Sequence, residues 1–559
     1  MNRQQLFRKL PYLFFVLSLL LLVVSMLMNR SYFHHLAYGS VVWYQTKQVL
    51  SLLFLFAVGY AFVKVIQHHL PELWVCLLAF PTAVCLWCFC SEFLLLADFT
   101  YRFWRVCFLI GAGILVCCLF RRIRHIPLAA VTLPIGRTLA VVAGVCCLVS
   151  TGWNYIILNY DSYFYFSDYG KALTLMMSYK DIVSDNSFVL TNIGQFLPLV
   201  SSYMTYWGLD SGAPVLGFFI INLFAAFGTA VYEQVHARFG TKRAAGYAGV
   251  SLLLLASCSI FFLYTHWILS NTYILFYLFL LFYLGSEHWK SPSVDRALLI
   301  GLYTLAVTML RKEGLIIVCF LFICYSARKL YASWILALLF LPSAAYQIFY
   351  IYWLRHIIYA RTTLAFGTSL LSDNFMKMML LGIVATFCYL LVLHFLAERI
   401  LKRYLMHVMT LFLIAALCLF MSKDLTLSVD FIDTWLRNFS GIGFGFCSLQ
   451  ILLLVTLVLL VGHTPAVRNE KSPKDREIPR YGYSLFFVLG NVLITFIIYL
   501  QKRNLDVGID NSGLRALYQI IPVFYYAAMT AIAPLFEKPM IRKSGNQSEP
   551  DKYELSGKK

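Results

Sequence analysis

Long apolar runs recur along nearly the whole chain, separated by shorter polar segments. A helix that crosses a bilayer needs about 20 mostly apolar residues, and runs of that kind follow one another from residue 11 to residue 534. We therefore predict an all-α, polytopic membrane protein with about 16 transmembrane helices. The predicted spans are residues 11–28, 49–66, 73–92, 103–120, 138–157, 214–232, 245–263, 270–286, 297–310, 314–326, 332–352, 377–396, 404–421, 441–461, 483–500 and 516–534.

The spans at 297–310 and 314–326 are short, and the polar pair Arg311-Lys312 separates them. They are either two helices or one helix broken at mid-depth. The N-terminus is basic and precedes an apolar run, but no small-residue cleavage site follows. We expect an uncleaved first span.

Composition agrees with the apolar pattern. The 559 residues are 61% hydrophobic and 13% charged, which excludes a soluble globular protein. The 15 cysteines lie almost wholly inside predicted spans, where they are expected to be small apolar packing residues. Cys85, Cys88 and Cys90 have a metal-like spacing, but that span offers no His.

The net charge of +19 would suit nucleic acid, but its distribution does not. With the N-terminus inside, the dense basic clusters fall on inner segments, which is the positive-inside bias that sets orientation. Both termini are then cytoplasmic and no nucleic-acid partner is expected. The 158–213 loop, with five Asp and two Lys, faces out.

Three regions follow from this order. Residues 1–128 form an N-terminal block of four spans, residues 129–534 a larger transmembrane core with the outer loop 158–213, and residues 535–559 a disordered cytoplasmic tail. Nearly all polar outer segments belong to the core, so we expect function there. No Gly-x-x-x-x-Gly-Lys-Ser/Thr segment occurs, which gives no support to an ATP-driven mechanism.

The outer loop contains two apolar-periodic stretches. Phe166, Tyr169, Leu173 and Met177 fall at helical spacing and predict an amphipathic helix in the outer interface. Residues 194–210 predict a second helix, lying on the surface or re-entrant. Together they would form a platform over the mouth of the bundle.

Asp161 is the leading candidate for chemistry, because it opens the outer loop directly after an apolar helix. It would act as a general base, or as a ligand of a divalent metal, on an acceptor hydroxyl. A helix cap is the alternative. Asp168, further along the same loop, would cap or assist.

Outer cations are the second candidate group. Arg311 and Lys312 interrupt an apolar stretch where the chain should reach the outer surface, and Arg515 precedes the last span. Charges at membrane depth are costly and usually functional. A lipid phosphate suits them, since Arg offers a planar fork for phosphate oxygens; snorkelling side chains at helix ends are the alternative.

The order of these features resembles the GT-C superfamily of integral-membrane glycosyltransferases, which includes protein O-mannosyltransferases and aminoarabinose transferases. The resemblance covers roughly residues 138–534. The segments that carry it are the acidic Asp161 after a span, the Pro-bearing segment 194–210, Ser270-Asn271-Thr272, Arg311-Lys312-Glu313-Gly314, and the stretch from Arg515 to Pro522. The family often has Asp where this chain has Asn271, and it commonly has one span before the outer loop, whereas here the four spans of residues 1–128 come in addition.

The resemblance implies transfer of a sugar, with inversion, from a polyprenyl-phosphate donor to a glycan, lipid or protein acceptor on the outer face. Asp161 would deprotonate the acceptor, assisted by Asp168, while Arg311, Lys312 and Arg515 would hold the phosphate. Asn271 and Tyr163 would also bind substrate. We expect a bacterial plasma membrane enzyme of cell-envelope synthesis, with no certain cofactor and a divalent metal as an option.

Two alternatives stay open. A polysaccharide polymerase or ligase would use the same lipid-linked sugars and depend more on outer Arg residues. A lipid-linked-sugar flippase or other transporter would need charged residues along a path through the spans. The predicted spans are nearly free of charge, which favours a site at the outer surface.

Overall fold

The structure is a computed structural model. It describes residues 3–32, 38–67, 70–125, 135–152, 167–177, 194–209, 212–258, 261, 265, 267–290, 294–311 and 518–536, together with short stretches between residues 314 and 457. Every regular element in these ranges is a helix. Six of the helices are long and apolar enough to cross a membrane, so the chain is a multi-pass helical membrane protein.

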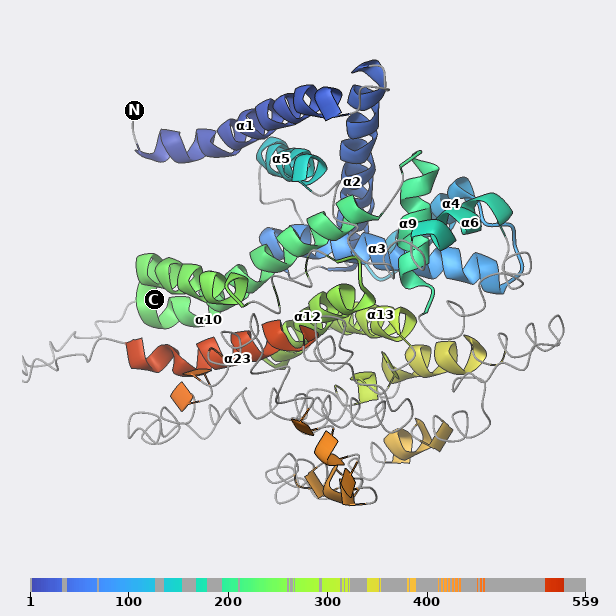
Figure 1. Cartoon of the computed structure of the whole chain (residues 1–559), viewed down its shortest axis with the longest axis vertical. Helices are drawn as coiled ribbons and strands as arrows, with labels where there is room; N and C mark the ends of the chain where they lie inside the picture. The colour runs from blue at the N-terminus through green and yellow to red at the C-terminus, as the bar shows by residue number, and fades with distance from the viewer. Residues whose placement is uncertain are drawn as a thin grey trace, which may run out of the picture.

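The N-terminal helices lie where the apolar runs predict them. They are α1 (Arg3–Tyr32), α2 (Tyr38–Ile66), α3 (Glu72–Leu96), α4 (Phe103–Ile123) and α5 (Ile135–Gly152). Helix α1 packs on α5 and α2 packs on α3 (Figure 1). Along α4, Phe108 is 69% exposed and Val116 is 63% exposed; apolar faces of this kind suit lipid and not water.

The outer-loop region gives two described helices, α6 (Tyr169–Met176) and α9 (Phe196–Tyr206), which pack on each other (Figure 1). Tyr169 and Leu173 are buried, as the helical spacing predicts. Met177 instead ends the helix in a left-handed conformation, with φ 61°. Helix α9 was expected on the surface or re-entrant; most of its side chains are buried, and it packs against α3 and α6, which argues against the surface alternative.

Helix α10 (Ala213–Ala256) joins two predicted spans without a loop. The chain breaks at Gly240, whose φ of 69° and ψ of 167° are non-helical. Glycine tolerates a positive φ because it has no Cβ. The second half ends at Ala256, short of the predicted residue 263.

Helices α12 (Ser270–Lys290), α13 (Val294–Leu310) and α23 (Ile521–Ile532), followed by the 3₁₀ turn η2 (Ala533–Phe536), complete the described elements. Helix α10 lies between the α1–α5 pair and the group of α12, α13 and α23 (Figure 1). Two tyrosine hydroxyls fix α12 and α13 to α3: Tyr277 donates to the Pro81 carbonyl at 2.8 Å, and Tyr303 lies 2.8 Å from the Thr82 hydroxyl.

The start of α13 is anchored by a buried cation. Arg121, at the end of α4, donates to the Ile66 carbonyl at 2.7 Å and pairs with Asp295 at 3.3 Å. Asp295 lies in the first turn of α13, where a carboxylate also interacts favourably with the helix dipole. These contacts hold the first turn of α13 against the ends of α2 and α4. Because α13 is one continuous helix to Leu310, they also help to place its far end.

Candidate functional site

Arg311 follows directly after α13, and its guanidinium meets the start of α12. The Arg311 Nη1 atom donates to Asn271 Oδ1 at 2.6 Å. Asn271 is 1% exposed, whereas Arg311 is half-buried. A charged donor at this distance makes a strong hydrogen bond. The contact therefore holds the guanidinium of the half-buried Arg311 against a buried amide.

A second donor holds the same amide oxygen. Gln519 Nε2 lies 3.1 Å from Asn271 Oδ1, and an amide oxygen can accept two hydrogen bonds. The neighbouring Tyr518 hydroxyl lies 3.4 Å from the Thr272 hydroxyl. The segment just before α23 is thus tied to the first turn of α12, and Asn271 has one fixed orientation.

A glycine turn brings the start of α9 against the end of α13. Gly194 has φ 88°, and a Cβ built there would lie 2.7 Å from the Met309 carbonyl oxygen and 3.0 Å from that of Leu310. Only glycine fits both the backbone conformation and the close approach. Gln195 follows Gly194, and Arg311 follows Leu310, so this close approach brings the two parts of the chain that carry Gln195 and Arg311 together in space.

Gln195 belongs to a buried polar group that we name the Glu92 cluster: Glu92, Tyr169, Gln195, Tyr346 and Tyr350. Gln195 Nε2 donates to the Tyr350 hydroxyl at 3.2 Å, and the Tyr346 hydroxyl lies 3.5 Å from Glu92 Oε1. The rings of Tyr346 and Tyr350 stack at 5.7 Å. Glu92 is 1% exposed and Gln195 is fully buried. A carboxylate, an amide and three phenols thus gather beside the end of α13.

Two polar atoms of the Glu92 cluster have no hydrogen-bond partner among the described residues, namely Gln195 Oε1 and the Tyr169 hydroxyl. Leaving such groups unsatisfied costs about 1–3 kcal/mol each. Burial raises the pKa of Tyr169 well above its usual value, and Tyr350 and Glu92 raise it further. The phenol therefore stays a hydrogen-bond donor at neutral pH, and the pair holds one unsatisfied donor and one unsatisfied acceptor among the described residues.

The structure joins two of the residues that the sequence assigns to substrate, Arg311 and Asn271, by a direct hydrogen bond. Asp168 occupies the N-cap position of α6, directly before Tyr169, but its side chain makes no capping hydrogen bond. It pairs with Lys171 at 3.7 Å, and its side chain is 41% exposed. The other assigned residues lie outside the described part of the chain; they are Asp161, Tyr163, Lys312 and Arg515.

Sequence reasoning alone did not assign Gln195, Gln519 or Glu92 to the site. Glu92 stood out only as one of few acids in the outer segments of the first four spans. Gln519 lies four residues after Arg515, inside the segment that carries the family resemblance. Gln195 follows Gly194, and a glycine before an apolar helix was the available signal. In each case the partner is distant in sequence, so the contact itself was not predictable.

The residues that the structure describes contain no group of three or more His, Cys, Asp or Glu side chains arranged to hold a metal ion. The divalent metal that the sequence leaves as an option depends on Asp161, which is not among those residues. Cys85, Cys88 and Cys90 are buried as free thiols.

Comparison with known proteins adds no relative. No family model, curated protein or solved structure matches this chain. The likeness to GT-C glycosyltransferases therefore stays a prediction that depends on the segments quoted above.

Proposed function

We propose that this protein is an inverting glycosyltransferase of the GT-C type, which moves a sugar from a polyprenyl phosphate to an acceptor hydroxyl. The proposal includes the finer topology: about 16 spans, both termini in the cytoplasm, and the site on the outer face of a bacterial inner membrane. The described helices support the multi-pass character, and the basic clusters support the orientation.

The observation that carries the proposal is the fixed guanidinium of Arg311. A phosphate leaving group gains negative charge as the glycosidic bond breaks, and a preorganised cation stabilises that charge without reorganising. Asn271 is buried, and Gln519 holds its amide oxygen, so Arg311 is preorganised in this sense. Lys312 is adjacent in sequence and Arg515 lies four residues before Gln519, which brings both close enough in the chain to join the same phosphate.

The reaction balances without an external energy source. Asp161 takes the proton of the acceptor hydroxyl, the oxygen attacks the anomeric carbon, and the bond from that carbon to the phosphate oxygen breaks. The carrier phosphate leaves as an anion held by Arg311. Asp168, paired with Lys171, supports the helix that carries Tyr169. Tyr163 contributes an aromatic face to the donor sugar.

The Glu92 cluster suits the sugar itself. Sugar hydroxyls are both donors and acceptors, and they complement the unpartnered Gln195 amide oxygen and Tyr169 hydroxyl. Because Gly194 contacts the carbonyls of Met309 and Leu310, this cluster is adjacent to the phosphate end of the proposed site. A sugar phosphate would thus meet a cation at one end and a hydrogen-bonding surface at the other.

The test uses the purified full-length protein in detergent, given a labelled polyprenyl-phosphate sugar and a panel of glycan, lipid and protein acceptors. We expect label to move to an acceptor with release of the carrier phosphate. Arg311→Gln should lower kcat/KM for the donor by about 10²-fold, since one preorganised donor is worth about 3 kcal/mol, and should leave the acceptor KM unchanged. Arg296→Gln, at the opposite end of α13, is the matched control and should behave as wild type.

Two results contradict the proposal. Equal losses in Arg311→Gln and Arg296→Gln would mean that Arg311 acts only on folding. Movement of labelled lipid across a sealed membrane, without transfer to any acceptor in detergent, would mean that the protein is a transporter. Growth of a polymer on the acceptor would instead identify the related polymerase chemistry.

A further inference from the structure

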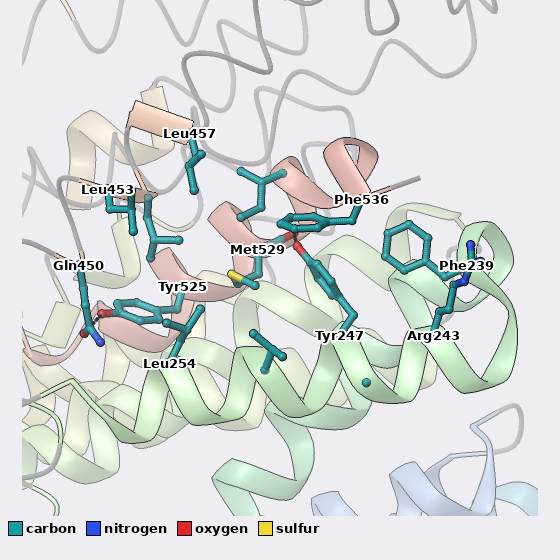
Figure 2. A pocket seen from close by; sticks show the side chains of 14 residues that line it. Phe239, Arg243, Tyr247, Leu254, Gln450, Leu453, Leu457, Tyr525, Met529 and Phe536 are labelled. Atoms are coloured by element: carbon teal, nitrogen blue, oxygen red, sulfur yellow. Dashed lines mark hydrogen bonds between the residues drawn. The ribbon is translucent and has the colours of Figure 1, made fainter. Parts of the chain in front are cut away.

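A groove is lined by side chains that the proposed reaction does not use. It is formed by α10 from Phe239 onward, by α23 with η2, and by four further side chains, Gln450, Leu453, Leu454 and Leu457 (Figure 2). Its volume of about 410 Å³ is in the range of ~300–1,000 Å³ that is typical of ligand pockets. Tyr247, Tyr525, Met529 and Phe536 supply much of its apolar wall.

The floor of the groove is one face of a helix. Arg243, Gly246, Tyr247, Val250 and Leu254 recur at spacings of three and four residues, so they line up along α10. From Arg243 to Leu254 the helix rises roughly 16 Å at about 1.5 Å per residue. The shape is therefore long and narrow, which suits an extended hydrocarbon chain better than a compact polar molecule.

The far end of the groove offers apolar atoms, because its polar groups already bond to one another. The Tyr525 hydroxyl donates to Gln450 Oε1 at 2.9 Å, and Gln450 Nε2 donates to the Ser257 hydroxyl at 2.8 Å. The Tyr247 hydroxyl donates to the Met529 carbonyl at 2.5 Å. Val250 in the groove floor is 53% exposed, and Leu253 beside the groove is 71% exposed, so this surface of α10 is suited to the hydrocarbon of a bilayer.

Charge is confined to the opposite end. Among the 14 residues drawn around the groove, Arg243 is the single charged one, and its guanidinium lies beyond Phe239 at one end of the row of side chains (Figure 2). Arg243 is exposed and follows Lys242 close after the helix break at Gly240. A cation at the end of an apolar groove complements an amphiphile with an anionic head.

From these features we propose that the groove binds an anionic phospholipid of the cytoplasmic leaflet. One acyl chain lies along the α10 face from Gly246 to Leu254, and the phosphate contacts Arg243. The proposal shares no residue with Arg311, Asn271 or the Glu92 cluster, and only its choice of leaflet rests on the orientation included in the proposed function. In the orientation that the positive-inside bias indicates, this lipid site is on the cytoplasmic side and the proposed chemistry is on the outer side.

Two pairs of variants separate the headgroup from the chain. Arg243→Gln removes the charge in the groove, and Lys242→Gln removes its exposed neighbour, which does not line it. Gly246→Leu fills the groove, and Gly249→Leu makes the same change on the same helix outside it. A Cβ at either glycine meets no atom within 4 Å, so both positions accept the first atom of a side chain without a clash.

The measurement is the immobilised fraction of spin-labelled lipid around the full-length protein in phosphatidylcholine nanodiscs. We expect wild type to prefer phosphatidylglycerol over phosphatidylcholine about fivefold, the equivalent of one cation near a lipid phosphate. Arg243→Gln should abolish this preference and Lys242→Gln should retain at least half of it. Gly246→Leu should reduce the immobilised fraction of both lipids, whereas Gly249→Leu should not.

Three outcomes overturn the proposal. They are the absence of a preference in wild type, equal losses in Arg243→Gln and Lys242→Gln, and binding that is unchanged in Gly246→Leu. Unchanged binding in Gly246→Leu would mean that only a headgroup binds, at Arg243. Competition of inorganic phosphate with the lipid at the same affinity would mean the same. If Gly246→Leu does not fold, Gly246→Ala tests the same groove with a single methyl group. Sugar transfer should be unaffected by every one of these variants, so the two proposals fail separately.

Discussion

Replacing Asn271 by Leu tests whether the cation of the proposed site must be held in place. Leucine is close to asparagine in size but has no hydrogen-bonding atoms. The substitution removes the acceptor of Arg311 at 2.6 Å and of Gln519 at 3.1 Å. A hydrogen bond to a charged group is worth about 1.5–3 kcal/mol and a neutral one about 0.5–1.5 kcal/mol, so the two together amount to about 3 kcal/mol.

The expected kinetic effect follows from that energy. If the orientation of Arg311 serves the departing phosphate, Asn271→Leu should lower kcat/KM for the lipid donor by up to about 10²-fold, at about 1.4 kcal/mol per factor of ten. Asn271→Asp keeps an oxygen that can accept the hydrogen bonds of Arg311 and Gln519, and it turns the Arg311 contact into an ion pair. It should therefore stay within about tenfold of wild type, in keeping with the Asp that the GT-C family often has at this position.

A second buried asparagine provides the matched control. Asn222 on α10 is 7% exposed and donates to the Leu77 carbonyl at 2.6 Å, within the helical core. Asn222→Leu should lower the thermal midpoint of the purified protein but leave kcat/KM per folded molecule unchanged. The assay is donor turnover in detergent, normalised to the folded fraction. If Asn271→Leu and Asn222→Leu give the same kcat/KM, the argument that Asn271 positions Arg311 is refuted.

Two further substitutions probe the surroundings of the site. Gly194→Ala should destabilise the fold by about 1–3 kcal/mol, because φ is 88° there and a Cβ would lie 2.7 Å from the Met309 carbonyl oxygen. Gly111→Ala, in open space on α4, is the control and should not destabilise the fold. Equal thermal midpoints of the two variants would contradict this. Tyr169→Phe removes an unpartnered buried hydroxyl and should preserve stability while raising the donor KM. Tyr203→Phe, which loses a 2.6 Å bond to the Ser51 carbonyl, should lower stability instead; the reverse order would count against a ligand at Tyr169.

The sequence predicted the helices well where one apolar run corresponds to one helix. Helices α3 and α4 begin within one residue of the predicted spans, because the length of an apolar run is fixed by the thickness of the bilayer. Helix α10 differs because the polar connector between two predicted spans, residues 233–244, is itself helical except at Gly240, where the two halves meet. Helix α9 was predicted on the surface or re-entrant, and its burial, which includes Ser201 and Ser202, argues against the surface alternative.

The candidate site was predictable only in part, for a physical reason. A cation next to an apolar run, such as Arg311, is conspicuous because its desolvation is costly. A neutral amide such as Gln195 or Gln519 carries no such signal, since its role depends on which distant group it meets. Pairs like Asn271 and Gln519 are 248 positions apart, so their contact arises from the packing of α12 against the segment before α23.

The most direct test of the central claim is a single-turnover assay of the purified protein in detergent, where no sealed compartment exists. With a labelled polyprenyl-phosphate sugar and an acceptor, we predict that each sugar transferred releases one carrier phosphate. Asp161→Asn should stop both at unchanged protein stability, and Arg311→Gln should slow both by the same factor. Unchanged transfer by Asp161→Asn and Arg311→Gln, or carrier release without transfer to any acceptor, would contradict the account.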